Sequence, residues 1–142
     1  MAMMIGPLPE HLHADAVALW QQTGLTRPWN DPTADLHRAV RGSASTVLAA
    51  VEQGELRGTA MVGHDGHRGW LYYLAVVPAE QGRGLGRRLV AACEQWVWAR
   101  GIPKLQLMVR ADNAHAAAFY ERLGYADADV RVLGRRLDGV VP

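Results

Sequence analysis

The chain has 142 residues, a formal net charge of +1 and a single cysteine. This length is typical of one domain with one hydrophobic core, and the near-neutral charge argues against a general binder of nucleic acid or anionic membranes. One cysteine excludes an intramolecular disulfide, and no apolar run approaches the ~20 residues needed to span a bilayer. We therefore expect one soluble, cytoplasmic domain over residues 1–142, with neither a membrane nor a nucleic acid as partner.

The first third of the chain predicts two helices. Leucine, alanine and tryptophan at positions 12, 16, 19 and 20 follow helical spacing and predict a helix over Glu10–Thr23. Asp31 followed by Pro32 is typical of an N-cap and a first helical residue, so a second, short helix should end near Arg41. We expect helix, loop and helix before any strand.

Three strands should follow as an antiparallel meander. Thr46–Val51 and Leu56–Val62 flank Gln53-Gly54, which is typical of a hairpin turn. Trp70–Val77 is a third run with strong strand propensity, and Pro78 closes it.

The second half alternates helices and strands. Apolar residues from Leu85 recur at helical spacing until Gly101, and a strand is predicted over Leu105–Val109. A helix over Ala114–Leu123 and a last strand over Val130–Leu137 complete the pattern. The fold class is therefore α/β (α+β mixed), with a central, mostly antiparallel mixed sheet flanked by about four helices.

The stretch Gln81–Arg87 carries the clearest chemical signal, because it places three glycines between a predicted strand and the start of a predicted helix. Glycine lets the backbone approach a ligand, and the free N–H groups at a helix start favour an anion such as a phosphate. A P-loop would need Lys and Ser or Thr after Gly86, and a dinucleotide-binding fingerprint would need Gly or Ala at Leu89. Both alternatives fail, which leaves another phosphate site or a tight turn without a ligand.

Two blocks of the sequence resemble the GNAT (GCN5-related N-acetyltransferase) superfamily. Gln81-x-x-Gly84-x-Gly86, after a predicted strand, is similar to the Q/R-x-x-G-x-G/A acetyl-CoA signature. Asn113, with Tyr120 seven residues later and Gly124-Tyr125 beyond, is similar to a second block. The likeness identifies residues 46–137 as the recognisable core of a single GNAT-like domain.

The resemblance implies an acetyl-CoA-dependent N-acetyltransferase that moves acetyl to a primary amine by direct attack in a ternary complex. Tyr120 would be the general acid that protonates the departing CoA thiolate. Main chain on the third strand would pair with the pantetheine arm, and amides of the glycine-rich stretch would hold the pyrophosphate. The implied acetyl-CoA contacts are Leu74, Ala75, Val76, Gln81, Gly82, Arg83, Gly84, Leu85, Gly86, Arg87, Asn113 and Tyr120.

The sequence indicates the acceptor site less clearly than the acetyl-CoA site. The stretches 27–32 and 63–69 resemble those of a bacterial YpeA-type subgroup. In the superfamily the loop between the first two helices often borders the acceptor, so the resemblance implies an acceptor site near Arg27, Trp29, Asn30 and Asp31. The expected acceptor residues also include Asp65, His67 and Tyr72. The alternative is that Trp29 packs in the core and Asp31 only caps a helix.

The general base is not identified. Some relatives have Glu five residues before the asparagine, where this chain has Met108, and His64, Asp65, His67 and Glu80 remain candidates. A CoA-binding sensor without turnover and an acyltransferase for longer acyl groups are therefore the rival functions. Histidine pairs at 11 and 13 and at 64 and 67 lack a third ligand, so no metal is expected. The acceptor and the oligomeric state stay open, and a homodimer is the expectation from base rates.

Overall fold

The computed structural model describes residues 2–142, and the chain forms two compact units, one ending at Leu107 and one running from Met108 to Pro142. The first unit begins with β1 (Met4–Pro7), the 3-10 turn η1 (Glu10–Leu12), α1 (His13–Gln22) and α2 (Pro32–Arg41). It continues with β2 (Ser45–Glu52), β3 (Glu55–His64), β4 (Gly69–Val76), η2 (Pro78–Glu80), α3 (Leu85–Ala99) and β5 (Leu105–Leu107). The second unit contains α4 (Ala114–Arg122). The expectation of one domain over the whole chain stays a prediction.

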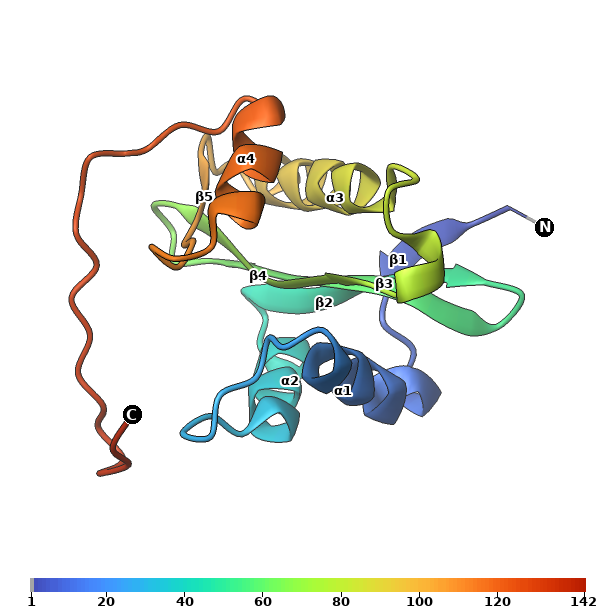
Figure 1. Cartoon of the computed structure of the whole chain (residues 1–142), viewed down its shortest axis with the longest axis horizontal. Coiled ribbons are helices and arrows are strands. Elements are labelled where there is room, and N and C mark those ends of the chain that lie inside the picture. Colours follow the sequence, from blue (N-terminus) through green and yellow to red (C-terminus); the bar gives the residue numbers. More distant parts are fainter. Residues whose placement is uncertain (1) are drawn as a thin grey trace. The chain divides into compact units, whose positions relative to one another are not determined.

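The first unit is built on a five-stranded sheet in the order β1-β2-β3-β4-β5. Every neighbouring pair is antiparallel except β4 and β5, which are parallel because α3 crosses between them. Helices α1 and α2 lie on one face of the sheet and α3 lies on the other (Figure 1). The mixed sheet with helices on its faces is confirmed.

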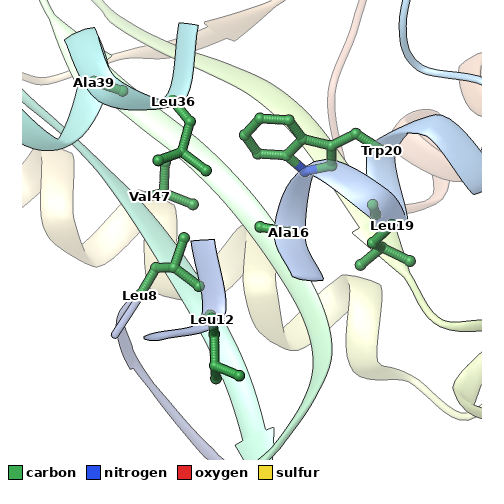
Figure 2. Close-up of a cluster of buried hydrophobic side chains, with 10 residues drawn as sticks. Leu8, Leu12, Ala16, Leu19, Trp20, Leu36, Ala39 and Val47 are labelled. Carbon is green, nitrogen blue, oxygen red and sulfur yellow. The ribbon is translucent and has the colours of Figure 1, made fainter. Parts of the chain in front are cut away.

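The core on the α1/α2 face is an apolar cluster that includes Trp20, which is fully buried (Figure 2). Leu36 of α2 and Val47 of β2 belong to the same cluster. The remaining labelled members are Leu8, Leu12, Ala16, Leu19 and Ala39. The helical spacing of positions 12, 16 and 19 brings these side chains to one face, as the sequence predicts.

The opposite core lies between the sheet and α3. Leu85, Leu89, Cys93 and Val97 are buried and recur every fourth residue, so they form one stripe along the helix. Gly69 of β4 lies under this stripe, where an added Cβ would come within 2.6 Å of a Val97 methyl group. Glycine at this position therefore lets the end of α3 approach the sheet.

Two strand predictions differ from the structure. The expectation that no strand precedes the helices is wrong, because β1 pairs with β2 in the register Met4 to Val51. Gly6 and Pro7 give this segment a low strand propensity, so only the neighbouring strand stabilises it. The strand expected over Leu105–Val109 ends at Leu107.

The last strand prediction is also wrong in this structure. Residues 130–137 form neither helix nor strand, and Leu133 and Leu137 are almost fully exposed. A strand needs a hydrogen-bonding neighbour, and this segment pairs with no strand among residues 2–142.

No helix within residues 2–142 is both long enough and apolar enough to cross a membrane.

Candidate active site

The glycine-rich stretch forms the turn that leads into α3. Gly82 and Gly84 have φ of +75° and +84°, in the left-handed region that favours glycine. An added Cβ at either residue would meet no other atom of the chain within 4 Å. Backbone conformation rather than crowding within the chain therefore requires glycine at these two positions.

The start of α3 presents unpaired backbone donors. The first hydrogen bond of the helix runs from the Arg88 N–H to the Gly84 carbonyl, 3.2 Å away. The amides of Leu85, Gly86 and Arg87 precede it and have no partner within the helix. Together with the positive end of the helix dipole, these amides can bind a phosphate.

Three arginine side chains add positive charge around this turn. Arg83, Arg87 and Arg88 are exposed, and the Arg83 guanidinium lies 3.7 Å from the Glu80 carboxylate. Since surface ion pairs of this kind are worth only about 0–1 kcal/mol, the pair leaves Arg83 able to reorient toward an anion.

Gln81 ties the turn to the end of β4. Its side-chain Nε2 donates a 3.1 Å hydrogen bond to the Val76 carbonyl. The next residue, Val77, donates its N–H to Arg57 of β3, so alternation along the strand directs the Val76 amide and carbonyl away from β3. Gln81 therefore forms a hydrogen bond with the open side of β4 and holds the glycine-rich turn beside this strand.

That side of β4 has a long unpaired stretch. Only Gly69–Leu71 pair with β5, whereas β4 continues to Val76. The main chain of Leu74, Ala75 and Val76, singled out in the sequence, lies in the part that β5 does not reach. An extended ligand can add to such an edge as if it were a strand.

A β-bulge separates the paired and unpaired parts of β4. Thr59 of β3 pairs with Ala75 and Met61 pairs with Tyr72, so two steps along β3 match three along β4. Tyr73 lies within the bulge with φ of +50°, an unusual value for a residue with a side chain.

Because of the bulge, the odd-numbered residues of β4 before it and after it lie on opposite faces of the sheet. Gly69 faces α3, whereas Tyr73 and Ala75 pack against the cluster on the α1/α2 face. Tyr72 lies on that face too, because its pairing partner Met61 packs against the same cluster. The bulge thus places two neighbouring tyrosines on one face.

A buried hydrogen-bond network holds the bulge. Thr59, the one fully buried polar side chain among residues 2–142, accepts a 2.8 Å hydrogen bond from the Trp20 indole N–H. Its hydroxyl donates in turn to the Tyr73 carbonyl at 3.0 Å. The Tyr73 ring stacks on Trp20 with 4.0 Å between the ring centroids. The strained residue is therefore fixed through both its backbone and its ring.

The Tyr73 hydroxyl extends this network to α2. It donates a 2.8 Å hydrogen bond to Asp35, which also forms an ion pair with Arg38. Burial and the nearby Asp35 carboxylate raise the pKa of Tyr73, so the phenol stays neutral. Sequence reasoning missed Asp35 and Thr59, because their partners lie 38 and 39 residues away and no local spacing reveals such contacts.

The loop between α1 and α2 contains four residues expected near the acceptor. The Asp31 carboxylate accepts hydrogen bonds from the N–H groups of Thr33 and Ala34, so it caps α2. The Arg27 guanidinium donates to two carbonyls of its own loop, at Gly24 and Thr26. Trp29 is half-buried and Asn30 is exposed. The capping function of Asp31 is confirmed, and an acceptor contact from any of the four stays a prediction.

The β3–β4 loop contains Asp65 and His67. Asp65 accepts hydrogen bonds from the N–H groups of His67 and Arg68 and from the Trp70 indole. The backbone bonds from Arg68 and His67 lower the pKa of Asp65 to about 2, which makes it a weak base. His67 is exposed. Burial, and then the charge of Asp65, raise the pKa of Tyr72 on the adjoining strand.

The other base candidates also have local contacts. The His64 Nδ1 accepts a hydrogen bond from the Gly66 N–H, and its ring centroid lies 6.0 Å from that of Trp96 on α3. Glu80 forms the ion pair with Arg83 described above. These contacts give both residues structural functions, and none of the candidates stands out as a base.

The second unit positions Asn113 and Tyr120 on one short helix. The Asn113 side chain accepts a 3.0 Å hydrogen bond from the Ala116 N–H and so caps α4. Tyr120, near the end of that helix, contacts Phe119 and Tyr125 edge-to-face at 5.0 and 5.8 Å between ring centroids. Both aromatic neighbours restrict the orientation of the phenol.

Neither a covalent nucleophile nor a metal centre emerges from the described residues. Burial raises the pKa of the Cys93 thiol to about 12, so almost no thiolate forms at neutral pH. Among residues 2–142, no three His, Cys, Asp or Glu side chains are grouped to hold a metal ion.

Comparison with known proteins identifies the family. Residues 14–125 match the model of the acetyltransferase (GNAT) family. The structure of the aminoglycoside N-acetyltransferase AAC(6')-Iy with a bisubstrate analogue superposes with a TM-score of 0.81 at 17% identity, over 96% of this chain and 99% of that chain.

Two further structures share the fold. The ribosomal-protein-S18-alanine N-acetyltransferase from Escherichia coli superposes with a TM-score of 0.75 at 26% identity, over 89% of this chain and 79% of that chain. A transcriptional regulator from Bacillus halodurans has a TM-score of 0.79 at 18% identity, over 96% of this chain and all of that chain (100%). With the fold and a family model that spans most of its length in agreement, the chain belongs to the acetyltransferase (GNAT) family and is an N-acetyltransferase.

Proposed function

We propose that this enzyme transfers acetyl from acetyl-CoA to a primary amine by direct attack in a ternary complex. The observation that carries the proposal is the hydrogen bond from Gln81 to Val76, which joins the open side of β4 to the glycine-rich start of α3. An unpaired strand and an anion site side by side match the two chemically different parts of CoA, its amide-containing arm and its pyrophosphate.

The residues of this region fit acetyl-CoA. Main chain at Leu74, Ala75 and Val76 would pair with the pantetheine arm, and the amides over residues 82–87 would hold the pyrophosphate. Open space beside Gly82 and Gly84 supports this assignment, since a ligand could approach the backbone there. Arg83, Arg87 and Arg88 would neutralise the remaining phosphate charge.

Tyr120 would supply a proton. When an amine attacks the thioester carbonyl, the C–S bond breaks and the sulfur leaves as a thiolate. We assign Tyr120 as the hydroxyl that protonates this sulfur, and Asn113 as a further cofactor contact. The raised pKa of Cys93 supports direct attack, because a neutral buried thiol is a poor acyl carrier.

The acceptor would approach from the α1/α2 face. Tyr72 is the most exposed polar side chain on that face of β4, beside the bulge. Arg27, Trp29, Asn30 and Asp31 from the α1–α2 loop, and Asp65 and His67 from the β3–β4 loop, complete the proposed acceptor set. Since none of the candidates stands out as a base, we infer that bound water carries the ammonium proton to bulk solvent before attack.

The proposal leaves the acceptor to experiment. An aminoglycoside acetyltransferase and an enzyme named for the alanine of a ribosomal protein share this fold, so small amines and peptide amines are both worth testing. The likeness to the YpeA-type subgroup and a cytoplasmic location, which one buried cysteine fits, are part of the same proposal.

Calorimetric titration with acetyl-CoA, followed by thiol-release assays over a panel of amines, tests this function. The panel should contain aminoglycosides, alanine-terminated peptides and free amino acids, with propionyl-CoA as an alternative donor. We expect binding of acetyl-CoA and release of CoA with at least one amine. Binding without release across the panel would favour a sensor, release only from propionyl-CoA would indicate a longer acyl donor, and absence of binding would refute the proposal.

A further inference from the structure

The β3–β4 loop carries a carboxylate that is not neutralised by an ion pair. Asp65 is exposed, and none of the ion pairs formed by residues 2–142 includes it. The neighbouring Arg68 donates its backbone N–H to Asp65, but its guanidinium donates to the His67 carbonyl instead. The loop therefore presents a negative charge to solvent.

The carboxylate is held in place and still has room for a ligand. Its Oδ1 accepts the N–H groups of His67 and Arg68 at 2.9 and 2.8 Å, which fixes its orientation. Its Oδ2 accepts a longer hydrogen bond, 3.3 Å, from the Trp70 indole N–H. Since a carboxylate oxygen can accept two hydrogen bonds, Oδ2 can accept another donor. A group that is already oriented loses little conformational freedom when it binds.

Two aromatic side chains of β4 lie beside this carboxylate. Trp70 and Tyr72 are two residues apart and precede the bulge, so they share the α1/α2 face of the sheet. Tyr72 has 41% of its surface exposed. Burial, and then the charge of Asp65, raise the pKa of Tyr72, so the carboxylate is close enough to act on the phenol. A carboxylate and an exposed aromatic ring together are suited to an organic cation.

The protonation state of Asp65 indicates which cation it binds. The backbone hydrogen bonds from Arg68 and His67 lower its pKa to about 2, so it is ionised at neutral pH. The reacting amine must be neutral when it attacks, and a carboxylate beside it would stabilise its ammonium form and oppose the loss of its proton. Asp65 therefore suits a cationic group of the acceptor that keeps its proton and does not react.

The strand gives the separation between the two amino groups. With the pyrophosphate at the start of α3, where Gln81 bonds to Val76, the pantetheine arm would run back along β4 and end near the bulge at Tyr73. Trp70, which bonds to Asp65, lies three residues before Tyr73. Three residues of an extended strand span about 10 Å, so the reacting and the bound nitrogen should be about this far apart.

We propose that Asp65, Trp70 and Tyr72 form a subsite for a second, non-reacting ammonium group of the acceptor. The substrate class is then an amine with at least two positive charges, with its nitrogens about 10 Å apart. Trp70 is a positioning residue that orients the Asp65 carboxylate. This inference rests on the proposed function for the position of the reacting amine.

A series of straight-chain acceptors tests the subsite. Diamines from ethane to octane, with amino groups at both ends, are compared with alkylamines of the same length. We expect kcat/KM to rise with the length of the diamine and, for the longer ones, to exceed that of the matched alkylamine at least about tenfold. Equal values of kcat/KM for the long diamines and the matched alkylamines would overturn the proposal.

Asp65→Asn removes the charge and keeps an oxygen for the backbone hydrogen bonds of the loop. It should raise the KM for long diamines about tenfold, with little change in kcat and none for alkylamines. Trp70→Phe removes the indole donor and should raise the same KM by a smaller factor. Asp15→Asn, at an exposed position of α1, removes the same charge elsewhere and should keep the preference. An equal loss with alkylamines in Asp65→Asn would show that the residue is only structural.

Binding without turnover separates this inference from the proposed function. Octane diamine is titrated calorimetrically into enzyme saturated with CoA, for the wild type and for Asp65→Asn. If the wild type releases no CoA with any amine but binds the diamine more tightly than Asp65→Asn does, the proposed function fails and the subsite stands. If CoA is released but both proteins bind the diamine equally, the subsite is refuted and the function stands. Absence of both release and binding refutes both.

Discussion

Thr59 connects two elements that sequence analysis treats separately. Its hydroxyl receives the Trp20 N–H from α1 and donates to the Tyr73 carbonyl in the β4 bulge. Because Thr59 and Trp20 are fully buried, the indole N–H cannot bond to water if the hydroxyl is removed. One side chain therefore stabilises the positive φ of Tyr73 and, with it, the separation of β4 from β5.

We expect Thr59→Val to lower both stability and turnover. Valine matches threonine in shape but leaves the buried Trp20 N–H without an acceptor, at a cost of about 1–3 kcal/mol, and removes the donor to the Tyr73 carbonyl. Urea unfolding measures this loss, and kcat should fall as the bulge relaxes. Thr59→Ser keeps the hydroxyl and should restore most of the activity. Equal values of kcat for the two variants would show that the network does not position the bulge.

Replacing Tyr120 tests whether its hydroxyl is the proton donor to the departing sulfur. Tyr120→Phe removes the proposed acid and keeps the ring, so kcat should fall about 10²- to 10⁴-fold with little change in the Kd for acetyl-CoA. Rates with the identified acceptor and calorimetric titration measure the two quantities. Tyr125→Phe, which removes a hydroxyl from a ring in contact with Tyr120, is the matched control. A similar modest loss in both variants would count against a proton donor at Tyr120.

At the scale of elements, β4 and α3 determine the proposed donor site together. The bulge reverses the faces of β4, and the parallel pairing with β5 ends at Leu71. The turn before α3 then brings free amides beside the unpaired main chain, where Gln81 holds them. Neither element would form the site alone.

Gly84→Val should weaken acetyl-CoA binding strongly. Valine disfavours the φ of +84°, at a cost of about 1–2 kcal/mol, and its side chain would project toward the proposed pyrophosphate. Gly101→Val is a close control at the other end of α3, because Gly101 has φ of +77° and equally open surroundings.

Thermal unfolding should show similar destabilisation of these two variants. Calorimetric titration should show that the Kd for acetyl-CoA is raised at least tenfold in Gly84→Val and unchanged in Gly101→Val. If both variants bind acetyl-CoA equally well, the turn is structural and holds no phosphate.

At the scale of the whole molecule, the two units have different amounts of buried surface. The sheet of the first unit is covered by apolar side chains on both faces, from Trp20 on one side to Leu89 on the other. The segment after Asp129 in the second unit leaves its valines and leucines exposed. All the buried hydrophobic side chains among residues 2–142 therefore belong to the first unit.

The sequence by itself determined the helices, the meander and the family. Helical spacing and caps are local, so Asp31 and the stripe from Leu85 to Val97 could be located from neighbouring residues alone. Gly82 and Gly84 likewise indicated the turn before α3, because a φ above zero is a property of single residues, and a phosphate site at this turn stays a prediction.

Only the tertiary structure decided the features that depend on distant partners. β1 forms because β2 lies beside it, and the bulge at Tyr73 is held by Trp20 and Thr59 from other elements. Conversely, residues 130–137 have the pattern of a strand but lack a neighbour within residues 2–142. Strand pairing and buried polar networks join residues far apart in the chain, and such contacts leave no periodic signal in a single sequence.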